Sequence, residues 1–462
     1  MLCKQCGAQI RKEDKRQDGI YQCPNCKKLY RGQGAAKSGA PAGKTPAKRR
    51  SARRFRLTPL HIGAIAAALA LVILIPVLAL GGREDPKPAE AEPTATVEAV
   101  EAAAEQTPEP IATPAPIEAA SAHFRAVGDI MSHKLQMTHA YQKDGSFDYD
   151  PQFEYVKDSL SKADYTIANF EMSIAVNKKY SSFPYFRVPE QILATLKDCG
   201  IDMFTMANNH ILDGFWDGLT HTIDKVEEYG FDHVGAYRSA EEYLQPVLKE
   251  INGIKFGFLA YTLDVNDNDK RIEADQAKIC VKRLSEADFK ADVQQLRDLG
   301  AEVVICMPHW GEEGKRSVAG SCKRYAQQMV DAGVDIILGS HPHVVLPIEL
   351  AQMEVNGEQK DVLIAWSMGN FISYMAAQYM DSGIIVDFTV SRDESGKISI
   401  HDVGYVPVYV WGNKNTFHLL CSGDFYSDKP NGMSNDDFKR MKQSVKEISN
   451  MIGQDGITLL QN

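Results

Sequence analysis

Residues 123–462 alternate short apolar runs with longer stretches in which apolar residues recur at helical spacing. The apolar runs have the length of buried strands and are Phe124–Val127, Tyr165–Ala168, Met203–Met206, Val303–Met307 and Ile336–Leu338. The predicted helices between them are Gln152–Ala163, Glu190–Cys199, Gly218–Tyr229, Glu286–Leu299 and Lys323–Ala332. This alternation is typical of α/β proteins with a substantially parallel sheet.

Hairpin turns and a run of later strands complete this pattern. Asn252-Gly253 and Asn356-Gly357 lie between apolar runs, as in two-residue hairpins, so antiparallel strands are mixed in. Further strands are predicted at Ile384–Val390 and Ile398–Val410, and a last helix, capped by Ser434, reaches about Met451. Because the strands give no clean break, we predict one domain over residues 123–462, a layered β-sandwich flanked by helices.

A longer apolar run precedes this domain. His61–Leu80 is twenty residues without Lys, Arg, Asp or Glu, which is long enough to cross a bilayer as a helix. A signal peptide would begin within the first residues and have a shorter apolar core. The basic residues directly before the run are Arg49, Arg50, Arg53, Arg54 and Arg56. The positive-inside rule therefore predicts a transmembrane helix over residues 57–81 of a single-pass, type II protein of the bacterial cell membrane, with the C-terminal domain extracytoplasmic.

Two Cys-x-x-Cys pairs lie in the segment that this topology places in the cytoplasm. They are Cys3 with Cys6 and Cys23 with Cys26. Four thiolates at that spacing suit tetrahedral zinc, and so short a segment cannot build a core without a metal. A disulfide pair is the alternative, which the reducing cytoplasm disfavours. We predict a structural zinc ribbon over residues 1–30.

Charge is distributed unevenly along the chain. Residues 1–56 carry 16 Lys and Arg against 3 Asp and Glu, and residues 31–56 are predicted to be a basic flexible tether near anionic lipid headgroups, with nucleic acid as the poorer partner. Residues 82–122 are rich in Ala, Pro and Glu and are predicted to be an extended linker. Residues 123–462 carry 33 Lys and Arg against 49 Asp and Glu, a net charge of −16 that disfavours nucleic acid as a partner.

Potential metal ligands follow five of the apolar runs by one to five residues. They are Asp129, Glu171, Asn209 with His210 and Asp213, His309, and His341 with His343. In one sheet these positions converge on a single edge, where open α/β sheets bind ligands. Any one of them alone is more often a cap, a turn residue or a packed ring. Together, the carboxylate, amide and imidazole groups suit manganese, iron or zinc.

These motifs resemble the CapA family of poly-γ-glutamate capsule biosynthesis, within the calcineurin-like metallophosphatase superfamily. The matching motifs are Gly128-Asp129-Ile130-Met131, Asn169-Phe170-Glu171, Ala207-Asn208-Asn209-His210 with Asp213, His309-Trp310-Gly311-Glu312-Glu313, Ser340-His341-Pro342-His343-Val344 and Gly369-Asn370-Phe371. The likeness covers about residues 124–374 and implies a metallophosphatase-like sandwich.

The resemblance also implies roles for residues at the strand ends. Asp129 and His343 would hold one metal, and Glu171 would be the bridging carboxylate. The ligands of the other metal would be Asn209, His309 and His341. His210 would be the general acid that protonates the leaving oxygen, and Asp213 is the second predicted catalytic residue.

Two departures from the superfamily pattern put two-metal chemistry in doubt. The first motif of the superfamily is Asp-x-His, but Met131 occupies the third position in this chain, and His133 lies two residues further on. The bridging acid is Glu171, where the superfamily has an Asp. Both departures change the ligand set of the first metal, the one assigned to Asp129.

Two functions from different classes agree with these observations. One is a metal-dependent hydrolase at the cell envelope that acts on a phosphoester or an amide. The other is a non-catalytic scaffold of a polymer synthesis or export complex. Either would have an anionic envelope polymer or its synthesis machinery as partner, which requires a locally basic rim on an acidic domain. The basic residues nearest the motifs are Arg187, Lys315, Arg316, Lys323 and Arg324, and they equally fit a solvated face.

Overall fold

The computed structural model describes residues 20–22, 29–31, 117–355, 358–375, 377–453 and 456–461. It divides into two units, Met1–Pro108 and Glu109–Asn462. In the first unit, β1 (Ile20–Gln22) pairs with β2 (Leu29–Arg31) in an antiparallel ladder. The four cysteines of the predicted ribbon, the tether, the span over 57–81 and the linker up to residue 116 lie outside the described residues. Within the described ranges, no helix is both long enough and apolar enough to cross a membrane.

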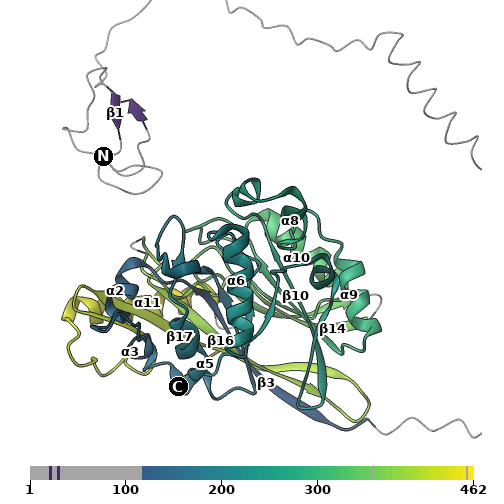
Figure 1. Cartoon of the computed structure of the whole chain (residues 1–462). Coiled ribbons are helices and arrows are strands. Elements are labelled where there is room, and N and C mark those ends of the chain that lie inside the picture. Colours follow the sequence, from purple (N-terminus) through teal and green to yellow (C-terminus); the bar gives the residue numbers. More distant parts are fainter. Residues whose placement is uncertain are drawn as a thin grey trace, which may run out of the picture. The chain divides into compact units, whose positions relative to one another are not determined.

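The second unit contains two large mixed sheets (Figure 1). The larger, nine-stranded sheet has the order β18-β17-β16-β3-β4-β7-β8, with β15 beside β3 and β19 beside β17. Its strands are β3 (Ala120–Ile130), β4 (Tyr165–Phe170), β7 (Met203–Thr205), β8 (Asp232–Val234), β15 (Asn370–Ile372), β16 (Ser382–Arg392), β17 (Ile398–Asn413), β18 (Thr416–Cys421) and β19 (Thr458–Leu459). The run β3-β4-β7-β8 is parallel, and β3, β16, β17 and β18 pair successively in antiparallel ladders, while β15 and β19 pair in parallel with β3 and β17.

The smaller sheet has six strands in the order β13-β14-β12-β11-β10-β9. They are β9 (Val247–Ile251), β10 (Ile254–Thr262), β11 (Val303–His309), β12 (Ile336–Leu338), β13 (Ile348–Val355) and β14 (Glu358–Ala365). The strands β10, β11, β12 and β14 are parallel. The predicted turn at Asn252-Gly253 joins β9 to β10 with both residues at positive φ, as a type I′ hairpin requires. Asn356-Gly357 lies outside the described residues, between the paired ends of β13 and β14.

The two sheets face each other across an apolar layer. Phe124 and Ile167 of the larger sheet belong to the same buried cluster as Phe256 and Ile305 of the smaller one. The rings of Phe124 and Phe256 meet edge to face at 4.8 Å between centroids. This layer confirms the predicted sandwich, but it corrects the assumption of one sheet, because the ligand-bearing strands β3, β4 and β7 lie in one sheet and β11 and β12 in the other. Alternating strands and helices do not reveal which strands share a sheet.

Helices cover both outer faces of the sandwich. Leu193 and Ile223, from α5 and α6, pack on Phe170 and Phe204 of the larger sheet, while Leu296 and Met329, from α9 and α10, pack on the smaller one. The helices are α2 (Lys134–Ala140), α3 (Asp150–Phe153), α4 (Lys157–Leu160), α5 (Gln191–Asp198), α6 (Phe215–Glu228), α7 (Ala240–Leu244), α8 (Ala274–Ile279), α9 (Phe289–Asp298), α10 (Gly320–Asp331) and α11 (Asn435–Ile452). Short elements complete the unit: β5 (Ser173–Ile174), η2 (Val176–Lys178), β6 (Arg187–Val188) and η3 (Asn268–Arg271).

One predicted helix is wrong in part. Gln152–Ala163 is divided into α3 and α4, because Val156 leaves the helical region at φ −124°. The break turns Tyr155 toward His418 and Phe425, whose rings it meets edge to face at 5.4 Å. A tertiary contact has therefore overridden local helical preference.

Candidate metal centre

The loops at the ends of five strands bring the predicted ligands together. Two groups have ligand atoms within 4.8 Å of one another, Asp129 with Glu171 and His343, and Glu171 with His309 and His341. Glu171 belongs to both groups, and both carboxylates are fully buried. The grouping matches the two ligand sets that the resemblance implies, although the residues come from two sheets. Metal coordination itself stays a prediction.

Two close backbone approaches position the ligand loops. A Cβ on Gly128 would lie 2.0 Å from the carbonyl oxygen of Gly369, so only glycine allows the segment before Asn370 to lie against β3. A Cβ on Gly339 would lie 2.3 Å from the carbonyl oxygen of Trp366. The turn that follows holds His341 at φ 97° and His343 at φ 57°, conformations that residues with a side chain rarely adopt. Backbone strain of this kind collects at functional sites.

Asp129 and His343 form the first pair of the cluster. The Nδ1 atom of His343 lies 2.9 Å from Oδ2 of Asp129 and 3.0 Å from Oδ1 of Asn370. Burial opposes the charged form of each group, but their hydrogen bond and mutual attraction outweigh it. The pKa of Asp129 is therefore lowered and that of His343 is raised.

Asn209, His309 and His341 form a second set around neutral imidazoles. The Nε2 atom of His309 lies 2.9 Å from Oδ1 of Asn209 and 3.1 Å from Nδ1 of His341. Burial, reinforced by the neighbouring His341 and His343, lowers the pKa of His309 well below its usual value. Burial and the charge of His343 lower the pKa of His341 to about 4. Both rings are therefore neutral near pH 7, the form that binds a metal.

Glu171 is the least satisfied group of the cluster. Its Oε1 atom is buried and accepts no hydrogen bond from the residues that the structure describes. That oxygen faces Nε2 of His309 at 3.5 Å and Nε2 of His343 at 3.7 Å. Burial, together with the charge of Asp129, raises the pKa of Glu171 well above its usual value. An orphaned carboxylate oxygen between two imidazole nitrogens is a donor set that fits a divalent cation.

His210 and Asp213 form a separate pair beside these ligands. The Nδ1 atom of His210 donates to Oδ2 of Asp213 over 2.8 Å, and the same oxygen accepts the backbone N–H of Phe186 over 2.6 Å. The other carboxylate oxygen accepts from Nδ2 of Asn268 over 3.3 Å. Burial raises the pKa of Asp213 despite these bonds. A carboxylate that holds one nitrogen of an imidazole leaves the other nitrogen to exchange a proton with a ligand.

Three residues without a predicted role orient the ligands. Nδ2 of Asn169 donates to Oδ1 of Asp129 over 2.8 Å, Oγ of Ser340 lies 2.9 Å from Nδ1 of His309, and Asn370 contacts His343. All three lie within the motifs matched in the sequence. Asn169 and Ser340 could have been found because they lie within two residues of Glu171 and His341, whereas Asn370 is far from every predicted ligand in the sequence. Second-layer partners of metal ligands typically fix tautomer and ring orientation.

The structure also shows what lies at the departure from the superfamily pattern. Met131 is 2% exposed and packs in the apolar cluster beneath α5 and α6, so it offers no ligand. His133, whose reach was open, has a buried Nε2 atom without a partner among the described residues, and its ring meets that of Phe186 at 4.9 Å. The same Phe186 ring also meets that of His210 at 4.9 Å, so His133 lies near the cluster. Burial and the charges of His343 and His210 lower the pKa of His133 to about 4.

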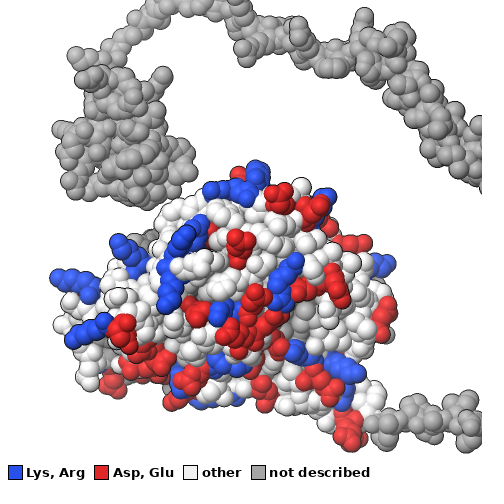
Figure 2. Space-filling view, viewed as in Figure 1, with Lys and Arg blue, Asp and Glu red and all other residues white. Residues whose placement is uncertain are grey.

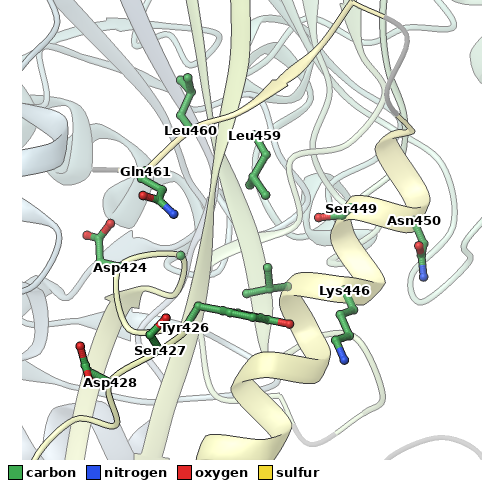
Figure 3. A pocket seen from close by; sticks show the side chains of 12 residues that line it. Asp424, Tyr426, Ser427, Asp428, Lys446, Ser449, Asn450, Leu459, Leu460 and Gln461 are labelled. Carbon is green, nitrogen blue, oxygen red and sulfur yellow. The ribbon is translucent and has the colours of Figure 1, made fainter.

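A cavity of about 610 Å³ lies elsewhere, between α11, β19 and the loop at residues 423–428. Figure 3 shows Tyr426 and Lys446 on facing walls of this cavity, near Leu459 of β19. None of the predicted ligands lines it. The candidate centre is therefore recognised by its buried charges rather than by its volume.

The comparisons with known proteins agree with the motifs. The family model described as bacterial capsule synthesis protein PGA_cap matches residues 123–375. The chain is 27% identical over 298 residues to the PGA biosynthesis protein CapA of Bacillus subtilis (strain 168), covering 61% of this chain and 72% of that protein. It is 26% identical over 258 residues to the capsule biosynthesis protein CapA of Bacillus anthracis, covering 53% of this chain and 58% of that protein.

Two solved structures of hydrolases are also similar. The calcineurin-like phosphoesterase YfkN from Bacillus subtilis matches with a TM-score of 0.40 at 17% identity, covering 72% of this chain and 98% of that chain. The NAD nucleotidase NadN of Haemophilus influenzae matches with a TM-score of 0.40 at 12% identity, covering 74% of this chain and 58% of that chain. Since the family model spans more than half of the chain, this protein belongs to the family of bacterial capsule synthesis proteins PGA_cap.

Proposed function

We propose that this protein acts in the synthesis of a poly-γ-glutamate capsule or a similar envelope polymer, as a membrane-anchored extracytoplasmic hydrolase that depends on a divalent metal. The observation that carries the hydrolase is the buried cluster in which Glu171 belongs to two potential ligand groups. The assignment of the polymer rests on family membership and on the names of the two Bacillus relatives. The anchor rests on the apolar run His61–Leu80 and the arginines before it.

The ligand roles divide between the two groups. Asp129, Glu171 and His343 would hold one ion, and Glu171 with Asn209, His309 and His341 would hold the other. A bound divalent metal of this kind supplies Lewis-acid polarisation of the bond that is cleaved. Metal binding requires neutral imidazoles and deprotonated carboxylates together. The lowered pKa of His309 and His341 favours this, whereas the raised pKa of His343 and of Glu171 means that a metal would displace a proton there.

His210 would supply the proton that the leaving group needs. Because Nδ1 of His210 donates to Asp213, Nε2 is the nitrogen that would bind the proton, in the imidazolium form, and release it to the leaving group. Asp213 is buried and also held by the N–H of Phe186, so it fixes both the tautomer and the orientation of the ring. General acids placed in this way typically contribute about 10²–10⁴-fold to the rate.

A non-catalytic scaffold is the second candidate, and one observation favours it. Met131 packs in the core at the position where the superfamily carries a histidine ligand, so the Asp129 group has fewer donors. A centre with one well-formed group can stabilise the fold and bind polymer without turnover. The two functions differ in what they require of His210, because a scaffold has no use for a proton donor.

The test compares His210→Ala with His341→Ala in cells that lack the chromosomal copy. Metal content is measured on each purified full-length variant, and polymer production is measured in the cells. Hydrolysis predicts that both variants fail in the cell while only His341→Ala loses metal. A metal-replete His210→Ala protein that restores full polymer production would contradict the hydrolase and leave the scaffold.

The proposed topology has its own test. Protease added to cells stripped of their wall should digest residues 83–462 and spare the N-terminal segment with its four cysteines. Protection of the large domain from protease would refute the extracytoplasmic assignment.

A further inference from the structure

Two arginines share one pair of aromatic rings beside the His210–Asp213 pair. The guanidinium carbon of Arg187 lies 5.5 Å from the ring centroid of Tyr185 and 5.4 Å from that of Phe215. That of Arg271 lies 5.7 Å from Tyr185 and 4.3 Å from Phe215. Cation–π contacts at these distances hold a guanidinium in place without using its N–H donors. We name the four residues the arginine patch.

Neither arginine of the patch forms an ion pair with a carboxylate of the described residues, although the charge of Arg187 acts against the rise that burial causes in the pKa of Asp213. Within the described part of the chain, no Asp or Glu lies within ion-pair distance of Arg187 or Arg271; Arg187 donates from Nε to the backbone oxygen of Asp213 over 2.8 Å, and Arg271 donates to the hydroxyl of Tyr185 over 2.8 Å. Arg238 shows the usual arrangement on this domain, since it pairs with three carboxylates over 2.7–2.8 Å. A guanidinium has five N–H donors, so most donors of the patch are open to a ligand.

The patch adjoins the proposed proton donor. Arg187 follows Phe186, whose ring meets that of His210 at 4.9 Å and whose N–H binds Asp213. Arg271 ends η3, and Asn268 at the start of η3 binds the other oxygen of Asp213. Arg187 precedes Asp213 in the sequence and Arg271 follows it, and both belong to segments that contact Asp213.

The backbone at Phe215 adds a cost that the local fold does not explain. Phe215 is the first residue of α6, yet it has φ 58°, in the left-handed region that disfavours a bulky side chain. The conformation costs about 1–2 kcal/mol. The aromatic ring contacts both guanidinium groups, and Phe215 belongs to none of the buried apolar clusters.

The sign of the patch is opposite to that of the domain. Residues 123–462 carry a net charge of −16, and the face in Figure 2 shows acidic and basic side chains interspersed. An anionic polymer is repelled by such a domain unless cationic groups are open at its binding site. Unpaired guanidinium groups meet that need, and their planar fork matches the two oxygens of a carboxylate.

We propose that Arg187 and Arg271 bind neighbouring free carboxylates of a γ-linked polyglutamate chain and thereby hold it beside His210. This inference rests on the proposed function for the identity of the polymer. Each residue of such a chain keeps one carboxylate outside the peptide bond, so two guanidinium groups engage two successive residues. Arg187 and Arg271 determine specificity, whereas Tyr185 and Phe215 position them.

The test measures binding of a labelled γ-glutamyl oligomer to the full-length chain by fluorescence anisotropy, with and without a chelator. Arg271→Ala should weaken binding by about tenfold, because a charge-assisted hydrogen bond is lost. Lys270→Ala is the matched control: it removes the same charge from the neighbouring residue, but Lys270 pairs with Asp267 over 2.6 Å. It should change affinity by less than about twofold. Arg271→Lys keeps the charge but loses the planar fork of N–H donors, so its affinity for the oligomer should lie between those of Arg271→Ala and Lys270→Ala.

The outcomes separate this inference from the proposed function. Equal losses for Arg271→Ala and Lys270→Ala would overturn the patch, since only overall charge would matter, and would leave the proposed hydrolase untouched. Arg271-dependent binding of polyphosphate, with no binding of the γ-glutamyl oligomer, would overturn both the carboxylate assignment and the proposed polymer. Arg271-dependent binding of the oligomer supports the patch even if His210→Ala proves fully functional. Arg271 is exposed, so its variants are expected to keep the melting temperature of the wild type.

Discussion

Arg125 and Asp129, four positions apart on β3, each belong to a cluster of buried charged side chains. The two clusters differ in whether their members fulfil one another's hydrogen-bonding needs. At Arg125, Nε donates to Asp387 over 2.7 Å, and Nη1 donates to the hydroxyl of Ser159 over 2.6 Å. The other oxygen of Asp387 lies 3.0 Å from Nε2 of His123. At the cluster around Asp129, by contrast, the Oε1 atom of Glu171 has no hydrogen-bond partner among the described residues.

The difference appears again in the pKa values. Burial opposes ionisation of Asp387, but His123 and Arg125 outweigh it and lower its pKa, so the charged form belongs to the fold. Burial raises the pKa of Glu171, and Asp129 adds to the effect. The first cluster is therefore balanced in charge within the folded chain. In the second, two buried carboxylates lie close together, and a bound cation would balance their negative charge. Such an imbalance of charge marks a functional site more reliably than burial of charge alone.

The largest effect is expected from breaking the complete cluster. Asp387→Ala leaves the guanidinium of Arg125 buried without its counter-ion, which should lower the free energy of unfolding by about 3–5 kcal/mol. Urea denaturation of the full-length chain measures the change. Glu394→Ala, which removes an exposed carboxylate nearby, should cost no more than about 0.5 kcal/mol. Similar small losses for both variants would mean that the Arg125 cluster does not stabilise the fold.

At the cluster around Glu171, by contrast, removing a carboxylate is expected to raise the free energy of unfolding, by less than the loss expected for Asp387→Ala. The pKa of Glu171 is raised by folding, so its contribution destabilises the fold progressively as pH rises from the unfolded pKa through the folded one. In the presence of a chelator at pH 7.5, Glu171→Gln should therefore raise the free energy of unfolding, because the amide carries no charge to bury. Added Mn²⁺ should stabilise the wild type and have less effect on the variant. A loss of stability in Glu171→Gln without metal would show that the carboxylate is structurally satisfied.

The smallest effect is a pH dependence at His123. Its hydrogen bond with Asp387 raises its pKa against burial, so the stabilisation is fully present below the unfolded pKa near 6.5 and is lost as pH rises through the folded pKa. His123→Ala should cost up to about 1 kcal/mol at pH 5.5 and less at pH 8.5. Denaturation curves at the two pH values measure the difference. An equal cost at both would assign the role of His123 to packing.

The sequence predicted which side chains come together in the buried cluster because each follows an apolar run at a strand end. Asp129, His309 and His341 all carry that local signal, and the strands themselves were found within a few residues of their observed bounds. The pairing of the strands into two sheets has no local signal, since it depends on contacts between distant segments. The same is true of Asn370, which reaches His343 because Gly128 and Gly369 touch. Sequence spacing likewise does not reveal the turn that buries Nε2 of His133 near the cluster.

Metal content tests the central claim most directly, namely that the cluster around Glu171 binds a divalent cation. Metals are first removed from the full-length chain with a chelator, a single equivalent of zinc is added for the four thiolates of the predicted ribbon, which prefer zinc, and the chain is then titrated with Mn²⁺ by calorimetry. His309→Ala removes a buried ligand, and His401→Ala removes a histidine at the far strand β17 that contacts Ser391 and Asp402. The account predicts at least one Mn²⁺ bound by the wild type and by His401→Ala, and an affinity at least about tenfold lower in His309→Ala. Equal Mn²⁺ binding by the wild type and His309→Ala, or none by either, would contradict it.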